Sequence, residues 1–170
     1  MPRNTLSSAS PLAQAQAVAP PKPKPDPPPP PMVDEKYGEV AQIMALPQSK
    51  LIAILKDPNG SVYAKAKACQ RLAVVGDRSA VPALASLLTE PQLAHYARFG
   101  LEPIPDQSAD QALRGALDKV KGGLLVGVIN SIARRRDRRA IGVLAKLRSD
   151  SDPEVANAAD SALAAIRPPM

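Results

Sequence analysis

The sequence predicts an all-α fold: an α-solenoid of about four stacked helix hairpins, preceded by a disordered proline-rich N-terminal segment. Three observations support this prediction. A pattern of about thirty residues recurs along the chain, the apolar residues are almost all aliphatic, and 11 of the 20 prolines lie within residues 1–31. We therefore expect two parts, a Pro-rich leader or tether over residues 1–32 and a helical domain over residues 33–170.

The leader contains the segment PPKPKPDPPPPP at residues 20–31. Proline lacks an amide donor and restricts the residue before it, so this segment is expected to form neither helix nor sheet. It should populate polyproline II, in which these residues span about 37 Å. Two functions remain open: a spacer that holds the domain away from something attached upstream, and a ligand for an aromatic-lined groove that recognises PxxP. The spacer is favoured because no flanking specificity residue stands out.

The recurring pattern starts at an aspartate. Asp77, Asp106 and Asp137 are 29 and 31 residues apart, and Ala, Leu and a further apolar residue follow each at offsets of 3, 7 and 10. Such spacing places the apolar side chains on one face of a helix, and the preceding Asp is a natural N-cap for the free amides of the first turn. The apolar positions are Ala80, Leu84 and Leu87; Ala109, Leu113 and Ala116; Ala140, Leu144 and Leu147.

A second helix is expected after each of these helices. Its apolar periodicity is plainest in PEVANAADSALAAI at residues 153–166, where Pro153 suits a first helical position. Further helices are expected at 47–55, 64–72, 93–101 and 124–132, and VDEKYGEVAQIMAL at 33–46 is expected to be an extra amphipathic helix.

A two-helix unit cannot bury its apolar face alone, so neighbouring units must stack, which predicts a right-handed solenoid with a shallow curve. The shared core must be aliphatic, because the chain has three Tyr, one Phe and no Trp. Leu101, Ile132 and Leu163 are expected to be buried, and truncation of one of them to Ala should cost about 2–5 kcal/mol.

The segments VVGDRSAVPALASLLTE at 74–90 and DPEVANAADSALAAI at 152–166 resemble the two helices of a HEAT repeat. The variety is the short, phycobilisome-lyase-like one, and the resemblance covers about residues 47–167. It implies a HEAT-type fold and a protein–protein scaffolding role, sometimes as a module of a larger bacterial protein. It implies no lyase activity, because no residue set here suggests one.

One feature of the HEAT pattern is missing. HEAT second helices often carry an Arg just after the first apolar position, where it bonds the turn Asp of a neighbouring repeat. In this chain the corresponding positions are occupied by Lys65, Ala94, Leu125 and Ala156. Stacking is therefore expected to rely on packing.

The concave face is the first candidate site, since the second helices line it in solenoids. A mixed apolar and polar patch at its middle suits a peptide or a partner helix. The alternative is a register shifted by one residue, which would put Val126 and Ile129 in the core. Threading the repeat places these residues in the patch: His95, Arg98, Phe99, Val126, Ile129 and Asn130.

The arginine-rich segment ARRRDRRA at residues 133–140 is the second candidate site. Fixed guanidinium forks suit phosphate or carboxylate. The alternative is a solvated turn between helices, and the lack of nearby aromatic residues for stacking argues against nucleic acid. The candidate anion ligands are Arg134, Arg135, Arg136, Arg138 and Arg139, with Arg114, Lys119, Lys121 and Arg148 as an extension of the patch.

Other chemistry has little support in the composition. The net charge of +6 is only mildly basic, and a single cysteine excludes an internal disulfide and a Cys-rich metal site. Cys69 is expected to be a small buried apolar residue, and His95 is the only histidine. We therefore expect no enzyme, no cofactor and no metal. The expected function is partner binding on the concave face, with anion or nucleic-acid binding through Arg134–Arg139 as the alternative.

The compartment remains open. No apolar run reaches the length of about 18 residues that a membrane span needs, and the first twenty residues lack the continuous apolar stretch of a secretory signal. A cytoplasmic location is favoured, and a periplasmic or secreted one would follow if a signal peptide preceded Met1. The partner's identity and the oligomeric state are also open.

Overall fold

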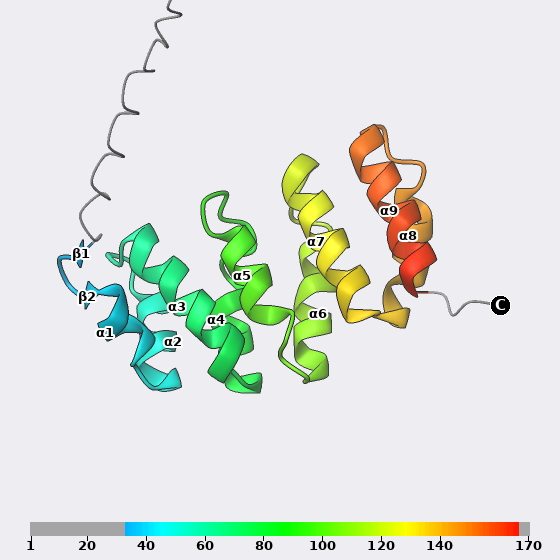
Figure 1. Cartoon of the computed structure of the whole chain (residues 1–170). Helices are drawn as coiled ribbons and strands as arrows, with labels where there is room; N and C mark the ends of the chain where they lie inside the picture. Colours follow the sequence, from blue (N-terminus) through cyan, green and yellow to red (C-terminus); the bar gives the residue numbers. More distant parts are fainter. Residues whose placement is uncertain (1–32, 167–170) are drawn as a thin grey trace, which may run out of the picture. The chain divides into compact units, whose positions relative to one another are not determined.

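The computed structural model of the chain describes residues 33–166, within the compact unit Pro31–Met170. The Pro-rich segment predicted at residues 1–32 lies outside the described residues. The regular secondary structure of the described residues is helical apart from one short hairpin, which confirms the all-α prediction for this part of the chain (Figure 1). No helix within residues 33–166 combines the length and the apolar character that crossing a membrane requires.

The elements follow one another with short connections. In chain order they are β1 (Val33–Asp34), β2 (Gly38–Glu39), α1 (Val40–Met44), α2 (Gln48–Lys56), α3 (Val62–Val75), the 3₁₀ turn Arg78–Ala80, α4 (Val81–Ala85), α5 (Ala94–Leu101), α6 (Gln107–Ala116), α7 (Gly122–Arg135), the 3₁₀ turn Arg138–Ala140, α8 (Ile141–Leu147) and α9 (Pro153–Ile166).

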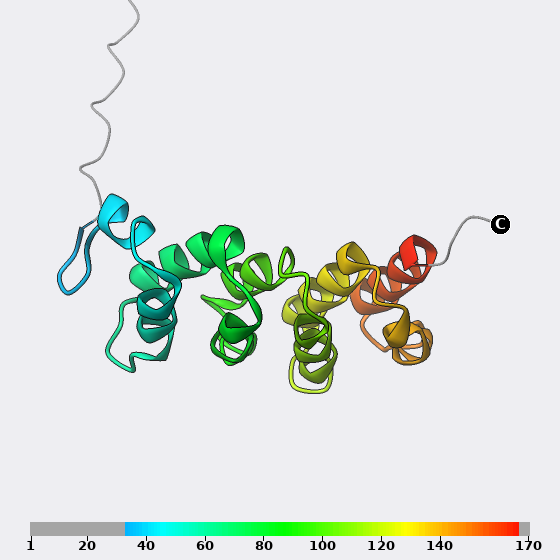
Figure 2. The same cartoon turned by 90° about the horizontal axis from the view of Figure 1, so that it is seen from below.

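Helices α2 to α9 form four pairs: α2 with α3, α4 with α5, α6 with α7, and α8 with α9. The second helices of the pairs contact one another in chain order, from α3 through α5 and α7 to α9, and the first helices α2, α4 and α6 do the same. Figure 2 shows these pairs side by side, with the first and the second helices in separate rows.

The three aspartates of the repeat cap helices, as the sequence predicts. The side chains of Asp77 and Asp106 accept hydrogen bonds of 2.8 Å from the amides of Ser79 and Ser108, and Asp137 accepts one of 3.1 Å from Arg139. Asp106 caps α6 directly, whereas the other two cap a 3₁₀ turn that leads into α4 or α8. Each carboxylate satisfies an amide that the helix itself leaves free.

The core contains the repeated apolar positions. Ala80, Ala109 and Ala140 are fully buried, as are Leu84, Leu113 and Leu144. Leu87 and Ala116 are buried, while Leu147 is half-buried and packs against the core. The prediction that Leu101, Ile132 and Leu163 are buried is confirmed.

The expected amphipathic helix at residues 33–46 is wrong for its first half. Val33 pairs with Glu39 and Asp34 with Gly38 in an antiparallel hairpin, and only Val40–Met44 is helical. The Asp34 carboxylate accepts from the amides of Lys36 and Tyr37, at 2.9 and 2.7 Å. Gly38 has a positive φ of 77°, which favours glycine. Side-chain capping and this glycine stabilise a turn in place of a helix.

Polar contacts join neighbouring pairs at all three junctions, so the expectation that stacking relies on packing is wrong. Gln48 on α2 accepts from the Asp77 amide at 2.8 Å and donates to Ser79 Oγ at 2.8 Å. Arg114 on α6 forms an ion pair with Asp137, which caps the turn before α8. An arginine therefore does pair with the turn aspartate of a neighbouring repeat, as in the HEAT pattern, but this arginine, Arg114, lies on a first helix instead of a second helix.

Candidate functional site

A pocket of ≈ 120 Å³ opens between the second helices α5 and α7. We call it the α5–α7 pocket. Helix α7 makes more extensive contact with α9 than with α5, so the pocket lies where the row of second helices is least closely packed. The lining residues come from α5 and its C-cap, and from α7. They are His95, Arg98, Phe99, Glu102, Gly127, Asn130, Ser131 and Arg134.

Four of the six residues predicted for the concave patch line this pocket: His95, Arg98, Phe99 and Asn130. Val126 is half-buried against the core and is not among the lining residues.

The prediction for Ile129 is wrong, because its side chain is 0% exposed and belongs to the core. Successive residues of a helix point about 100° apart, so an outward Asn130 turns Ile129 inward. The alternative that the sequence left open, with Val126 and Ile129 in the core, therefore holds in full only for Ile129, while Val126 is half-buried against the core.

Glu102 joins the two walls of the pocket, which are formed by α5 and α7, through hydrogen bonds. Ser131 Oγ donates to Glu102 Oε1 at 2.7 Å, and Arg134 Nη1 donates to Oε2 at 3.1 Å. Both carboxylate oxygens of Glu102 are therefore engaged by α7. Glu102 and Ser131 were not predicted as site residues from the sequence. Their separation of 29 residues equals the spacing of the first two repeat aspartates, so the repeat could have indicated that the two residues lie side by side.

Arg98 differs from the other arginines of this region. Its side chain is half-buried, and burial lowers the pKa of its guanidinium, partly offset by the nearby carboxylate of Glu102. Among residues 33–166 the guanidinium has no hydrogen-bond or ion-pair partner. It lies against Gly127 so closely that a Cβ at that position would clash with it.

Phe99 supplies the apolar part of the site. Its ring is 48% exposed, which makes it one of the few exposed large apolar side chains of the described unit. His95, one turn earlier on α5, is exposed and stacks edge-to-face on Tyr96 with ring centroids 5.6 Å apart. An apolar ring beside polar donors is an arrangement typical of partner-binding surfaces.

The arginine-rich turn at residues 134–139 contains arginines with different roles. The Arg135 side chain is only 9% exposed and forms an ion pair with Asp110 on α6. It also donates to the carbonyls of Leu101, Glu102 and Ile104 after α5. The prediction of Arg135 as an anion ligand is therefore wrong, because its donors already satisfy internal acceptors.

The other arginines of the turn are more accessible. Arg134 is 73% exposed but forms the ion pair with Glu102. Arg136, which ends α7 with a φ of 53°, is exposed, as are Arg138 and Arg139. These three line a second pocket of ≈ 230 Å³ together with Arg114, Arg135, Gln107, Asp110 and Asp137.

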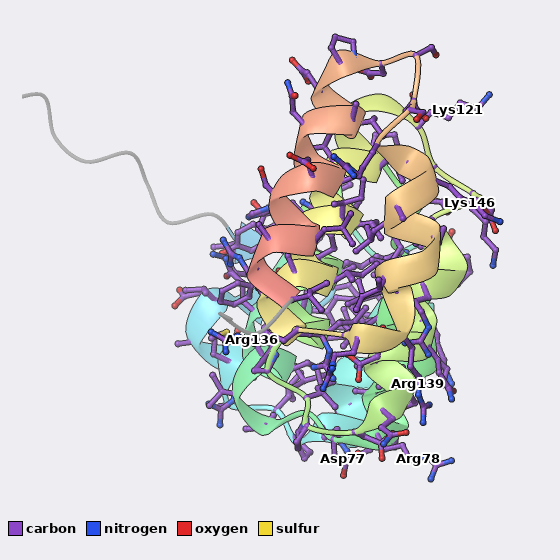
Figure 3. The ribbon with its side chains drawn as sticks, turned by 90° about the vertical axis from the view of Figure 1, so that its right-hand side faces the viewer. Asp77, Arg78, Lys121, Arg136, Arg139 and Lys146 are labelled. Atoms are coloured by element: carbon purple, nitrogen blue, oxygen red, sulfur yellow. The ribbon has the colours of Figure 1, made fainter. Side chains whose placement is uncertain are left out.

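The predicted extension of the basic patch to Lys121 is not supported by the geometry. Lys121 precedes α7 and Arg136 follows it, and a helix of 14 residues separates its ends by about 21 Å. Figure 3 shows Lys121 and Lys146 toward one end of the helices and Arg136 and Arg139 toward the other. The basic residues thus form two separate groups.

Cys69 is fully buried on α3, as predicted. Burial raises the pKa of its thiol to about 12, which is the opposite of the activation that a nucleophilic cysteine needs. Within residues 33–166 no three His, Cys, Asp or Glu side chains lie close enough together to hold a metal ion.

Comparison with known proteins adds no family to this description. No protein-family model matches the chain, and a search of curated proteins finds no match.

Proposed function

We propose that this chain is a non-enzymatic interaction module. In this proposal residues 33–166 are a short α-solenoid of HEAT-like hairpins that binds a protein or peptide through the surface of its second helices. The stacking of four helix pairs in chain order and the aspartate-capped repeat support the HEAT-like assignment. Stacked repeats present an extended surface of neighbouring helices, which suits elongated ligands.

The observation that carries this proposal is the α5–α7 pocket beside the half-exposed ring of Phe99. Aromatic anchors next to polar donors contribute much of the binding energy in protein interfaces. The pocket is small, at ≈ 120 Å³, whereas sites for drug-sized molecules usually reach about 300 Å³ or more. A protruding side chain of a protein partner fits such a hollow better than a free metabolite.

Selection of random twelve-residue peptides displayed on phage tests the proposal with the full chain as bait. We expect an enriched pool whose members lose binding to Phe99→Ala. The matched control is Thr89→Ala, an exposed position beside α4 in the row of first helices, and it should retain binding. A pool that does not distinguish Phe99→Ala from the wild type would overturn the proposal.

Anion binding at the arginine-rich turn is a second candidate function, on fewer residues than the sequence suggests. The pocket of ≈ 230 Å³ lined by Arg136, Arg138 and Arg139 favours it. Asp110 and Asp137 in the same pocket are paired with Arg135 and Arg114, which leaves a positive excess for an oxyanion. Nucleic-acid phosphate is the ligand that this excess would attract.

A further inference from the structure

Arg98 is a charged group whose surroundings do not supply a partner. It is half-buried, and the only carboxylate in its pocket, Glu102, already accepts hydrogen bonds from Ser131 and Arg134. Burial of an ionised group is costly unless an opposite charge and hydrogen bonds compensate it. The pocket thus contains a half-buried cation whose donors face water instead of a protein acceptor, and an incoming anion would stabilise it.

Gly127 determines where this cation lies. The absence of a side chain on α7 at this position lets the Arg98 guanidinium lie against the α7 backbone, and any Cβ there would clash with its carbon and both terminal nitrogens. The guanidinium therefore lies in the wall of the pocket, which Asn130 and His95 also line.

The net charge of the pocket determines which charge its ligand should carry. Arg98 and Arg134 outnumber Glu102, so the lining carries a net positive charge when His95 is neutral. A lysine or arginine of a partner would be repelled, whereas a carboxylate matches the planar guanidinium fork. The volume of ≈ 120 Å³ exceeds the roughly 30 Å³ of one water molecule, so the end of an acidic side chain can enter.

We propose that Arg98 binds a carboxylate of the partner, an aspartate or glutamate side chain that enters the α5–α7 pocket while a neighbouring apolar side chain packs on Phe99. This inference rests on the proposed partner-binding function and names the chemistry of its ligand. The partner segment is thus an acidic and apolar peptide. Its carboxylate replaces water around Arg98, and its apolar neighbour covers the exposed part of the Phe99 ring.

Synthetic peptides from the selected pool test this assignment. Their enriched sequences should share one Asp or Glu next to an apolar residue. Replacement of that residue by Asn or Gln should weaken binding to the wild-type chain at least about tenfold, the loss expected for a hydrogen bond between charged groups. Arg98→Gln should weaken the parent peptide equally, and the two changes together should cost little more than either one.

Two further variants separate the contact with Arg98 from a general loss of folding or of positive charge. Gly127→Ala keeps every charge but displaces the guanidinium, and it should weaken the acidic peptide while leaving the Asn or Gln peptide nearly unchanged. Because this variant and the peptide substitutions do not remove Arg98, the test stands even if Arg98→Gln fails to fold. Arg78→Gln, which removes an exposed arginine away from the pocket, should bind the parent peptide as the wild type does.

The outcomes separate the two proposals. A pool that depends on Phe99 but lacks a shared acidic residue and binds Arg98→Gln normally would overturn the carboxylate assignment and leave partner binding intact. A pool that is indifferent to Phe99→Ala, or no enriched pool, would overturn both.

Discussion

Arg135 at the end of α7 donates from Nε to Oδ1 of Asp110 on α6 over 2.5 Å, and from Nη2 to Oδ2 over 3.1 Å. The same guanidinium donates to the carbonyls of Leu101, Glu102 and Ile104. These carbonyls lie where α5 ends, and the last turn of a helix leaves its carbonyls without intrahelical partners. One side chain therefore joins α5, α6 and α7.

Replacement of Arg135 by Ala should strongly destabilise the folded unit. The side chain is 9% exposed, and its loss leaves the Asp110 carboxylate and several carbonyls without their donor. Breaking a buried ion pair by removing one partner costs about 3–5 kcal/mol, and we expect a loss near the lower end because Asp110 retains some contact with water. Urea unfolding followed by circular dichroism measures the change.

Arg138→Ala is the matched control for this experiment. Arg138 lies three residues further along the chain and is exposed, without an ion pair among residues 33–166. Its replacement should change the free energy of unfolding by no more than about 0.5 kcal/mol. Equal losses in the two variants would contradict the structural role assigned to Arg135.

Cys69 should be unreactive toward thiol reagents in the folded protein. Its side chain is fully buried, and burial raises the pKa of the thiol to about 12, so almost no thiolate exists at neutral pH and none is accessible. Alkylation by iodoacetamide, followed by mass spectrometry, should be slow in buffer and rapid in concentrated urea. Rapid alkylation without denaturant would show that α3 opens readily or that the thiol is exposed.

Stability should decrease at acidic pH partly through Asp57. Lys36 Nζ and Tyr37 Oη lie 2.6 and 2.5 Å from its Oδ2, and these contacts lower the pKa of Asp57 from its ordinary value of 3.8 to about 2. A carboxyl group with a lowered folded-state pKa stabilises the fold above its unfolded-state pKa. Its contribution is therefore complete above about pH 4 and is lost as the pH falls toward about 2.

Urea unfolding at a series of pH values between neutrality and acid tests this expectation. Asp57→Asn should lower stability at neutral pH and make its decline in acid shallower than in the wild type. Glu35→Gln, on the hairpin that carries Lys36 and Tyr37 and without a hydrogen bond or ion pair among residues 33–166, should keep the wild-type slope. An unchanged slope in Asp57→Asn would rule out its link to Lys36 and Tyr37.

The helix pairs were predictable because their signals are local. An aspartate that caps its own turn and leucines at helical spacing depend on neighbours within about ten residues, so Asp106, Ala109 and Leu113 predict α6 without knowledge of the rest of the fold. Residues 33–39 contain equally local signals, the Asp34 side chain and Gly38, but their turn chemistry competes with an amphipathic pattern. The hairpin formed because backbone capping by Asp34 outweighed that pattern.

The candidate site was predictable only in part, because it depends on tertiary contacts. His95, Arg98, Phe99 and Asn130 were found by threading the repeat, but the direction of Ile129 changes by about 100° with a shift of one residue. The burial of Arg135 depends on carbonyls more than thirty residues away along the chain. A run of arginines in a sequence does not distinguish a buried ion pair from exposed anion ligands.

The salt dependence of DNA binding distinguishes these roles within the arginine-rich turn. If the turn binds phosphate through Arg136, Arg138 and Arg139, simultaneous replacement of these three by Ala should reduce the slope of log K against log salt. The reduction is expected to be about 2.7, since each phosphate contact on duplex DNA contributes about 0.9. Gel shifts between about 50 mM and about 200 mM salt cover the range in which such slopes are measured.

Adding Arg134→Ala to the triple variant should not reduce the slope of log K against log salt any further, because Arg134 pairs with Glu102. A further drop of about 0.9 would show that this ion pair opens to bind phosphate. Lys121→Ala, at the other end of α7, is the control and should not alter the contribution of the turn. If the wild-type chain fails to shift duplex DNA even at the lower salt concentration, anion binding of this kind is excluded.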